Sequence, residues 1–263
     1  MLLDMLQSLV TPAPLAYRRL GCVGDAVRTG SRSRRCRRAW APHLAATREV
    51  VCKAIHGVAR HDTAVILGSG RLDDVPLTML AKSFARVVLV DVVHPFAARR
   101  RARPYRNVEM ITADLSGSFS LVLSRGSDLE APLPPICSER STDLVVSANL
   151  LSQLPLRPIE RLEASSRGYG RWRPDDGDDL GREIVARHLE ALAALPARVC
   201  LVTDLDQVEE DREGHVLDRL DLLYGTTLGE PERGWSWELA PFGEIARDRR
   251  LLHEVVGFSD WRP

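Results

Sequence analysis

The chain has 263 residues, of which 44% are hydrophobic and 27% charged, an ordinary balance for a globular domain with a sizeable core. Its 36 basic residues match its 36 acidic ones, which argues against a dedicated nucleic-acid or membrane-surface protein. The five cysteines are odd in number and form no CxxC pair, so neither a disulfide framework nor a zinc site is expected.

The amino-terminal residues do not have the pattern of a targeting segment. Met1–Val10 is apolar but short, lacks a basic start, and stops before Pro12, which makes it a poor secretion signal. No stretch of the sequence approaches the roughly 20 apolar residues that span a bilayer. We therefore expect a cytoplasmic protein with no membrane association.

The first sixty residues are expected to be helical. The apolar residues of residues 41–59 recur at helical spacing on one face, which predicts a helix packed against the following domain, with Trp40 and His43 placed to roof a cleft there. The basic stretch GSRSRRCRR, residues 30–38, is either a phosphate-binding arm or a solvated turn between two helices. We favour the turn, because no aromatic residues interleave the arginines to stack on bases.

From residue 63 the chain alternates short apolar runs with amphipathic segments, which is typical of a parallel sheet with helical crossovers. Parallel strands are expected at residues 64–67, 87–90, 108–112, 144–148 and 199–203. Two further runs, at 234–240 and 251–258, are expected to form an antiparallel edge pair. The predicted fold class is thus α/β, a doubly wound, mostly parallel seven-stranded sheet. Residues 61–263 would form this domain, and residues 1–60 an N-terminal helical extension.

The connections between the strands are less uniform. Asp73, Asp74 and Pro76 are expected to cap and start a helix through Phe84. Asp178 or Asp179 is expected to cap the helix before the fifth strand. Residues 115–142 are rich in Ser, Gly and Pro, and their structure is not predictable from the pattern. The loop at residues 165–179, with Tyr169 and Trp172, is either a substrate lid or a surface connection.

Every buried strand ends in a glycine or a polar residue. The five residues are Gly68, Asp91, Asp114, Asn149 and Asp204. In an open parallel sheet these carboxyl ends border the crevice in which ligands bind. Gly68 and Gly70 would allow a tight turn close to a ligand. Asp91, 21 residues after Gly70, is placed to accept both ribose hydroxyls of a nucleoside; the alternative is that Asp91 and Asp114 cap the next helices.

Residues 63–261 resemble the class I, Rossmann-like S-adenosylmethionine-dependent methyltransferase superfamily. The resemblance lies in VILGSG at the first strand, VVLVD at the second, MITADL at the third, VVSANLLSQLP at the fourth, and the terminal antiparallel pair. It implies S-adenosylmethionine as cofactor. The implied cofactor-binding residues are Gly68, Ser69 and Gly70 for the methionine part, Asp91 for the ribose, Asp114 and Leu115 for the adenine, and Asn149 and Leu150 beside the reacting methyl.

The glycine loop departs from the family pattern. The family's third glycine is Leu72 here, and its acidic residue at the head of the first strand is Ala64 or Val65. A nicotinamide dinucleotide fits worse, because its GxGxxG pattern needs a glycine where Asp73 stands.

Methyl transfer needs little acid–base machinery, because the sulfonium is already a strong donor and positioning supplies much of the rate. Asn149 and His94 are the candidate catalytic residues, the latter as a base where the acceptor holds a proton. His188 falls on an apolar helical face and is interpreted as a core histidine.

The expected function is S-adenosylmethionine-dependent methyl transfer to a small molecule. One alternative is another transfer from the same cofactor, such as an aminoalkyl group. A second is a non-catalytic ligand-binding protein on a degenerate methyltransferase fold.

Neither nucleic acid nor a metal ion is expected as a partner. The fourth strand ends in Ser-Ala-Asn-Leu, not the Asn-Pro-Pro-aromatic run of enzymes that methylate bases, so no nucleic acid is expected. The acidic residues between Asp204 and His215 are interpreted as a solvated face, so no metal is expected either.

Overall fold

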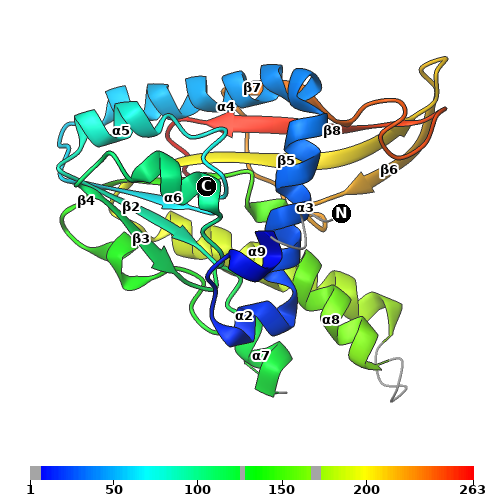
Figure 1. The fold of residues 1–263 in the computed structure, drawn as a ribbon, viewed down its shortest axis with the longest axis horizontal. Coiled ribbons are helices and arrows are strands. Elements are labelled where there is room, and N and C mark those ends of the chain that lie inside the picture. Colours follow the sequence, from blue (N-terminus) through cyan, green and yellow to red (C-terminus); the bar gives the residue numbers. More distant parts are fainter. Residues whose placement is uncertain (1–6, 125–127, 167–172) are drawn as a thin grey trace.

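The computed structural model describes residues 7–124, 128–166 and 173–263. Its centre is an eight-stranded sheet with the order β3-β2-β1-β4-β5-β8-β7, and β6 pairs with β5 outside this path (Figure 1). The strands are β1 (Thr63–Leu67), β2 (Arg86–Asp91), β3 (Val108–Thr112), β4 (Thr142–Ala148), β5 (Arg198–Glu210), β6 (Val216–Asp221), β7 (Arg233–Ala240) and β8 (Arg250–Phe258).

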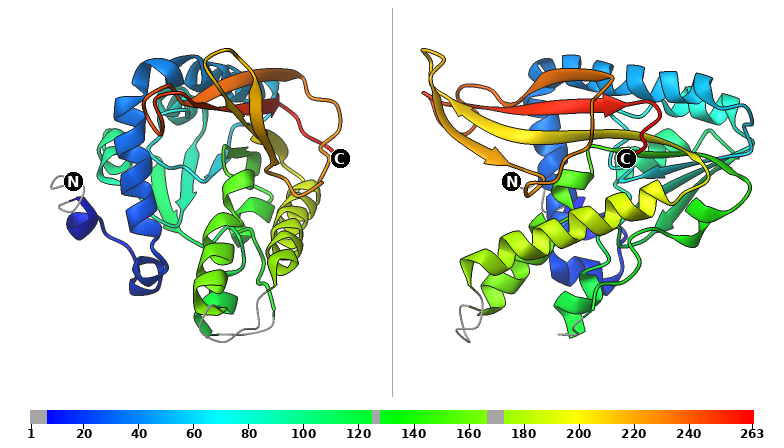
Figure 2. Two further views of the ribbon diagram at one scale, coloured as in Figure 1. Left: turned by 90° about the vertical axis from the view of Figure 1, so that its right-hand side faces the viewer. Right: turned by 180° about the vertical axis from the view of Figure 1, so that it is seen from behind.

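Helices cover both faces of the sheet. The α-helices are α2 (Leu15–Leu20), α3 (Cys22–Arg35), α4 (Arg37–Gly57), α5 (Leu77–Ser83), α6 (Phe96–Ala102), α7 (Phe119–Ser124), α8 (Leu156–Ser166) and α9 (Pro174–Ala193). Two short 3₁₀ turns are η1 (Pro135–Ser138) and η2 (Leu151–Gln153). Figure 2 shows α4 along one face of the sheet and α9 along the other. None of the helices in the described ranges is long and apolar enough to cross a membrane.

The two faces carry separate apolar clusters, because neighbouring residues of a strand point to opposite faces. Ala64 and Ile66 of β1 pack on α4, α5 and α6. Val65 and Leu67 of the same strand pack on η2 and α9. Strands β1 and β4 are buried along their whole length, as expected for central parallel strands.

The predicted sheet is confirmed in its main features. Strand β1 pairs in parallel with β2 and β4, β2 with β3, and β4 with β5. Strand β8 runs antiparallel between β5 and β7. The sheet has one strand more than expected, because β5 continues to Glu210 and turns back as β6. The β5–β6 hairpin, residues 206–221, is rich in acidic residues, which suits an exposed position. All six residues of β6 are exposed.

Two predicted helix caps are wrong. Helix α5 begins at Leu77 without a side-chain cap, because both preceding aspartates are used elsewhere: Asp73 binds Arg71 and Arg101, and Asp74 binds Asn149. Helix α9 begins earlier than predicted, at Pro174. The Asp176 carboxylate accepts the Arg173 backbone N–H at 2.7 Å there.

The sequence left the structure of three segments open, and the structure describes two of them. Most of residues 30–38 are helical: they end α3 and begin α4, and the turn between these helices is confined to Cys36. Residues 115–142 contain α7 and η1. Tyr169 and Trp172 lie outside the described residues, so the two interpretations of their loop both stay predictions.

Helix α4 is part of the main core. Trp40, Val51 and Ile55 belong to the same apolar cluster as Ala64 and Leu144 of the sheet. The apolar face predicted for residues 41–59 therefore packs as expected. Whether residues 1–60 behave as a separate unit stays a prediction.

Candidate functional site

A pocket of about 290 Å³ lies at the carboxyl ends of β1, β2, β3 and β4, near the lower limit for small-molecule sites. The sequence-predicted residues that line it are Gly68, Gly70, Asp91, Asp114, Leu115, Asn149 and Leu150. Ser69 and His94, also predicted, are almost fully buried and do not line it. The topology thus brings together four strand ends that are far apart in the sequence.

The glycine loop after β1 has left-handed backbone conformations. Gly68 and Gly70 have φ angles of 66° and 50°, which glycine adopts without steric penalty. A Cβ at Gly68 would lie 2.9 Å from a methyl carbon of Leu150. Leu72 is itself left-handed with φ 61°. A leucine side chain therefore stands on a backbone conformation that favours glycine.

Asp91 ends β2 and faces this loop. Its carboxylate accepts hydrogen bonds from the backbone N–H groups of Gly70 at 2.6 Å and Val93 at 3.2 Å. Burial raises the pKa of Asp91, and these backbone bonds oppose that rise. It does not cap α6, whose N-cap is Pro95. Because a carboxylate has about four acceptor positions, Asp91 keeps capacity for a ligand in the pocket.

Asp114 makes more hydrogen bonds within its own loop than Asp91 does. Its carboxylate accepts the Ser116 N–H at 2.8 Å, the Ser116 hydroxyl at 2.6 Å and the Phe119 N–H at 2.8 Å. It therefore organises the start of α7, as the capping alternative expected, and also lines the pocket. Leu115 beside it is 2% exposed and contributes apolar surface.

Asn149 follows β4 in a left-handed conformation, φ 53°, which asparagine tolerates better than most residues. Its Nδ2 donates to Oδ2 of Asp74 at 2.6 Å, while its Oδ1 is buried without a hydrogen-bond partner. Burial raises the pKa of Asp74, and the bond from Asn149 opposes this rise. No pattern in the sequence indicates this pair, because an aspartate shortly before a proline has the pattern of a helix cap.

Aromatic residues of α4 and β7 form a roof, as expected for Trp40 and His43. The His43 ring stacks on Trp237 with centroids 4.0 Å apart, and Trp40 meets the same ring edge-on at 5.0 Å. Trp235 Nε1 donates to His43 Nδ1 at 3.1 Å. Burial lowers the pKa of His43 to about 4, so the roof is uncharged at neutral pH.

The pocket has an excess of carboxylates. Both arginines in its lining are paired with lining aspartates: Arg71 with Asp73 at 2.8 Å, and Arg157 of α8 with Asp25 of α3. Within the described residues, no lysine or arginine forms an ion pair with the other three lining aspartates. These are Asp74, Asp91 and Asp114. The pocket therefore favours a ligand that carries positive charge.

The two histidines considered from the sequence are both buried. His94 Nε2 lies 2.9 Å from the Ile111 carbonyl oxygen, and burial lowers its pKa. His188 is fully buried beside Ser147 and the Leu115 carbonyl, which confirms its interpretation as a core histidine.

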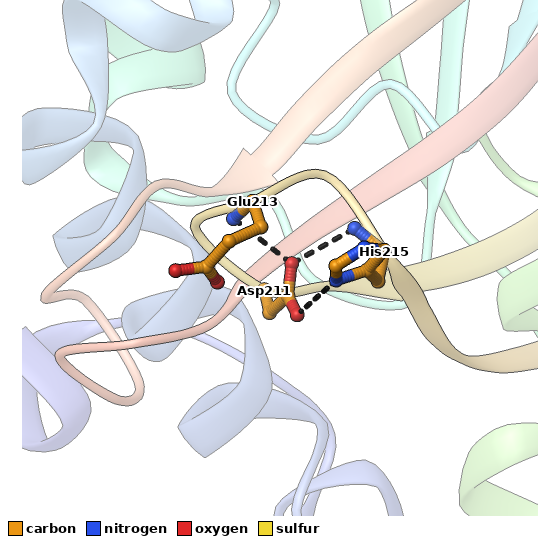
Figure 3. A group of neighbouring side chains, drawn as sticks. All are labelled: Asp211, Glu213 and His215. Carbon is orange, nitrogen blue, oxygen red and sulfur yellow. Dashed lines mark hydrogen bonds and ion pairs between the residues drawn. The ribbon is translucent and has the colours of Figure 1, made fainter.

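The acidic run after Asp204 does not converge on one site. Asp204 is buried and bonded to His253 at 2.9 Å. Asp211, Glu213 and His215 lie close together at the β5–β6 turn, where Asp211 accepts the backbone N–H groups of the other two and bonds His215 Nδ1 at 3.0 Å. Figure 3 shows that neither Asp211 nor His215 bonds the Glu213 carboxylate. Local hydrogen bonds account for this exposed group, and we assign it no ion.

Comparisons with known proteins give structural matches only. No protein-family model matches the chain, and no curated protein sequence does. A 1,6-didemethyltoxoflavin-N1-methyltransferase from Burkholderia thailandensis, with bound S-adenosylhomocysteine, is 16% identical over 93% of this chain and 92% of its own, with a TM-score of 0.39. The N-methyltransferase NodS from Bradyrhizobium japonicum, also with S-adenosylhomocysteine, is 14% identical over 80% and 84%, with a TM-score of 0.35.

A third match is an S-adenosylmethionine-dependent methyltransferase from Leishmania major. It is 14% identical over 96% of this chain and 81% of its own, with a TM-score of 0.38. All three TM-scores lie below 0.5, so the description of the fold rests on the strand order and register given above.

Proposed function

We propose that this protein binds S-adenosylmethionine in the pocket and transfers its methyl group to a small-molecule acceptor. The observation that supports this most is the convergence of Gly68, Gly70, Asp91, Asp114 and Asn149 around one pocket. These residues lie at the ends of four strands, and the family resemblance implies a cofactor role for each.

The residues fit this cofactor chemically. Gly70 has space where a side chain would stand, which leaves room for the methionine part; Asp91 has free acceptor positions for the ribose hydroxyls, and Leu115 offers apolar surface to the adenine. S-adenosylmethionine carries a sulfonium and an ammonium against one carboxylate, so it is a net cation. A pocket whose arginines are already paired with aspartates complements that charge.

When bound, the cofactor supplies an electrophilic methyl group. The contribution of the chain is then to hold an acceptor in line with it and to exclude water. Asn149, beside the end of β4, is the residue we assign to positioning. We assign no proton transfer to His94, because it is buried outside the pocket lining.

The proposal is tested with methyl-labelled S-adenosylmethionine and mixtures of small molecules of defined classes: amines, phenols, carboxylic acids and thiols. Label should pass into one class in the presence of the protein, and Asp91→Asn should slow the transfer. Label that stays in the cofactor with every class, although the cofactor binds, would favour the non-catalytic ligand-binding alternative.

A further inference from the structure

Asp74 is a pocket carboxylate that the proposed cofactor does not account for. The resemblance assigns Asp91 to the ribose and Asp114 to the adenine side, whereas Asp73 and Asp25 are neutralised by arginines. Asp74 remains, without a lysine or arginine partner among the described residues. Its one side-chain bond to another residue in that part of the chain comes from Asn149, the residue assigned to the methyl-transfer end.

The Asp74–Asn149 pair offers more free acceptors than free donors: the Asp74 carboxylate and Asn149 Oδ1 can accept, whereas one of the two amide N–H groups of Asn149 is already used. The bond between them uses an N–H of the Asn149 amide and Oδ2 of Asp74. That bond fixes the orientation of the amide, so its oxygen is turned away from Asp74 and has no partner. A buried acceptor without a partner is unfavourable, and the group that best satisfies both residues has more than one hydrogen to donate. The nitrogen of a neutral primary amine has that property, whereas a secondary amine, a hydroxyl or a thiol has one hydrogen and a carboxylate has none.

The surrounding walls suit an amine as well. Trp40, His43 and Trp237 line the same pocket, and aromatic faces attract the positive charge that an amine nitrogen gains as it is methylated. His43 does not compete with such a ligand, because its ring is uncharged at neutral pH. Asp74 is also next in sequence to Asp73, whose carbonyl oxygen is bonded by Arg48 of α4, so the loop that carries Asp74 is anchored to the helix that carries Trp40 and His43.

On the basis of the proposed function, we propose that Asp74 and Asn149 form the binding site for the reacting nitrogen of the methyl acceptor, so that the substrate class is a primary amine. The amine reacts in its neutral form: it donates one N–H to Asn149 Oδ1 and one to the Asp74 carboxylate, and its lone pair attacks the methyl carbon. As the new C–N bond forms, the electrons of the C–S bond remain on sulfur, and the nitrogen releases its proton to Asp74.

Binding measurements with two cofactor analogues test this site without turnover. S-adenosylhomocysteine lacks the methyl group. In sinefungin, a carbon bearing a primary amine replaces the sulfonium bearing its methyl, so the amine enters the space where transfer would occur. Titration calorimetry should show that the wild-type protein binds sinefungin more tightly than S-adenosylhomocysteine. Asp74→Asn should weaken sinefungin binding about ten- to a hundredfold and leave S-adenosylhomocysteine within about twofold.

Asp73→Asn is the matched control, because it removes the same charge from the same loop while the Asp74–Asn149 pair stays intact. It should keep the preference for sinefungin. Asp74→Ser provides a second neutral side chain, and circular dichroism checks the fold of each variant.

Two results would overturn the inference. One is an unchanged preference for sinefungin in both Asp74 variants. The other is an Asp74→Asn variant that loses affinity for sinefungin and for S-adenosylhomocysteine equally but binds 5′-methylthioadenosine as the wild-type protein does. Because 5′-methylthioadenosine lacks the amino-acid part, this result would mean that Asp74 holds the cofactor's own ammonium. If the wild-type protein binds none of the three nucleosides, the proposed function fails first, and this outcome is distinct from both.

Discussion

The backbone N–H of Gly70 donates a 2.6 Å hydrogen bond to Oδ2 of Asp91. This bond ties the loop after β1 to the end of β2, so the carboxylate proposed to bind the ribose also shapes the loop proposed to hold the methionine part. Ligand binding and loop geometry should therefore be coupled at Asp91.

Asp91→Ala should weaken S-adenosylhomocysteine binding about ten- to a hundredfold, because hydrogen bonds to a charged group contribute roughly 1.5–3 kcal/mol each. The free energy of unfolding should fall by less, since removal of a buried carboxylate also removes its desolvation penalty. Calorimetric titration and urea unfolding of the same variant measure the two quantities.

Asp91→Asn is the matched control, since its amide oxygen can still accept the Gly70 N–H. It should unfold at nearly the wild-type temperature and still bind the nucleoside less tightly than the parent. Wild-type affinity in both variants would show that Asp91 only shapes the loop.

Substitutions at Leu72 should follow an unusual order of stability. Leu72 is 4% exposed and left-handed, so Leu72→Ala loses buried apolar contacts, about 2–5 kcal/mol, and keeps an unfavourable backbone. Leu72→Gly loses the same contacts but relieves roughly 1–2 kcal/mol of strain. The free energy of unfolding in urea should therefore be highest for the wild-type protein, lower for Leu72→Gly and lowest for Leu72→Ala. An alanine variant more stable than the glycine variant would mean that position 72 is not left-handed in solution.

Asp74→Asn should stabilise the protein above neutral pH. Burial raises the pKa of Asp74, so the folded protein holds that proton more tightly than the unfolded chain does. The wild-type protein accordingly loses stability as the pH rises from about 4, the ordinary carboxyl value, through the raised pKa. An asparagine has no proton to lose.

Melting temperatures of the two proteins measured across pH test this sign. The variant should melt higher at pH 8, and the difference should shrink as the pH falls toward 4. A wild-type protein that is the more stable of the two at pH 8 would contradict the assignment, and would mean that the bond from Asn149 outweighs the desolvation of the carboxylate.

Deletion of residues 1–60 should abolish cooperative unfolding. Helix α4 supplies Trp40, Val51 and Ile55 to the cluster that covers β1 and β4, and its loss would expose that face of the sheet. Thermal unfolding of the truncated chain tests this. An unchanged melting temperature and unchanged nucleoside binding would make the segment a dispensable extension.

The central strands could be predicted from the sequence because β1, β2 and β4 are buried on both faces, and a continuous apolar run is the direct result of such burial. Their polar ends at Asp91 and Asn149 could be predicted for the same reason. Strand β6 could not be predicted, because both of its faces are exposed. Its sequence, Val-Leu-Asp-Arg-Leu-Asp, therefore shows no alternation of apolar and polar residues. The partnership of Asp74 with Asn149 was missed because it joins residues 75 positions apart, and only the folded sheet brings them together.

The central claim, that the pocket is built for S-adenosylmethionine, is tested most directly by calorimetric titration of the purified protein with S-adenosylmethionine, S-adenosylhomocysteine and NAD. The strand-end residues and the excess of carboxylates predict micromolar or tighter binding of the first two and none of NAD, whose pyrophosphate carries the charge that this pocket disfavours. Binding of NAD, or of none of the three, would contradict the account.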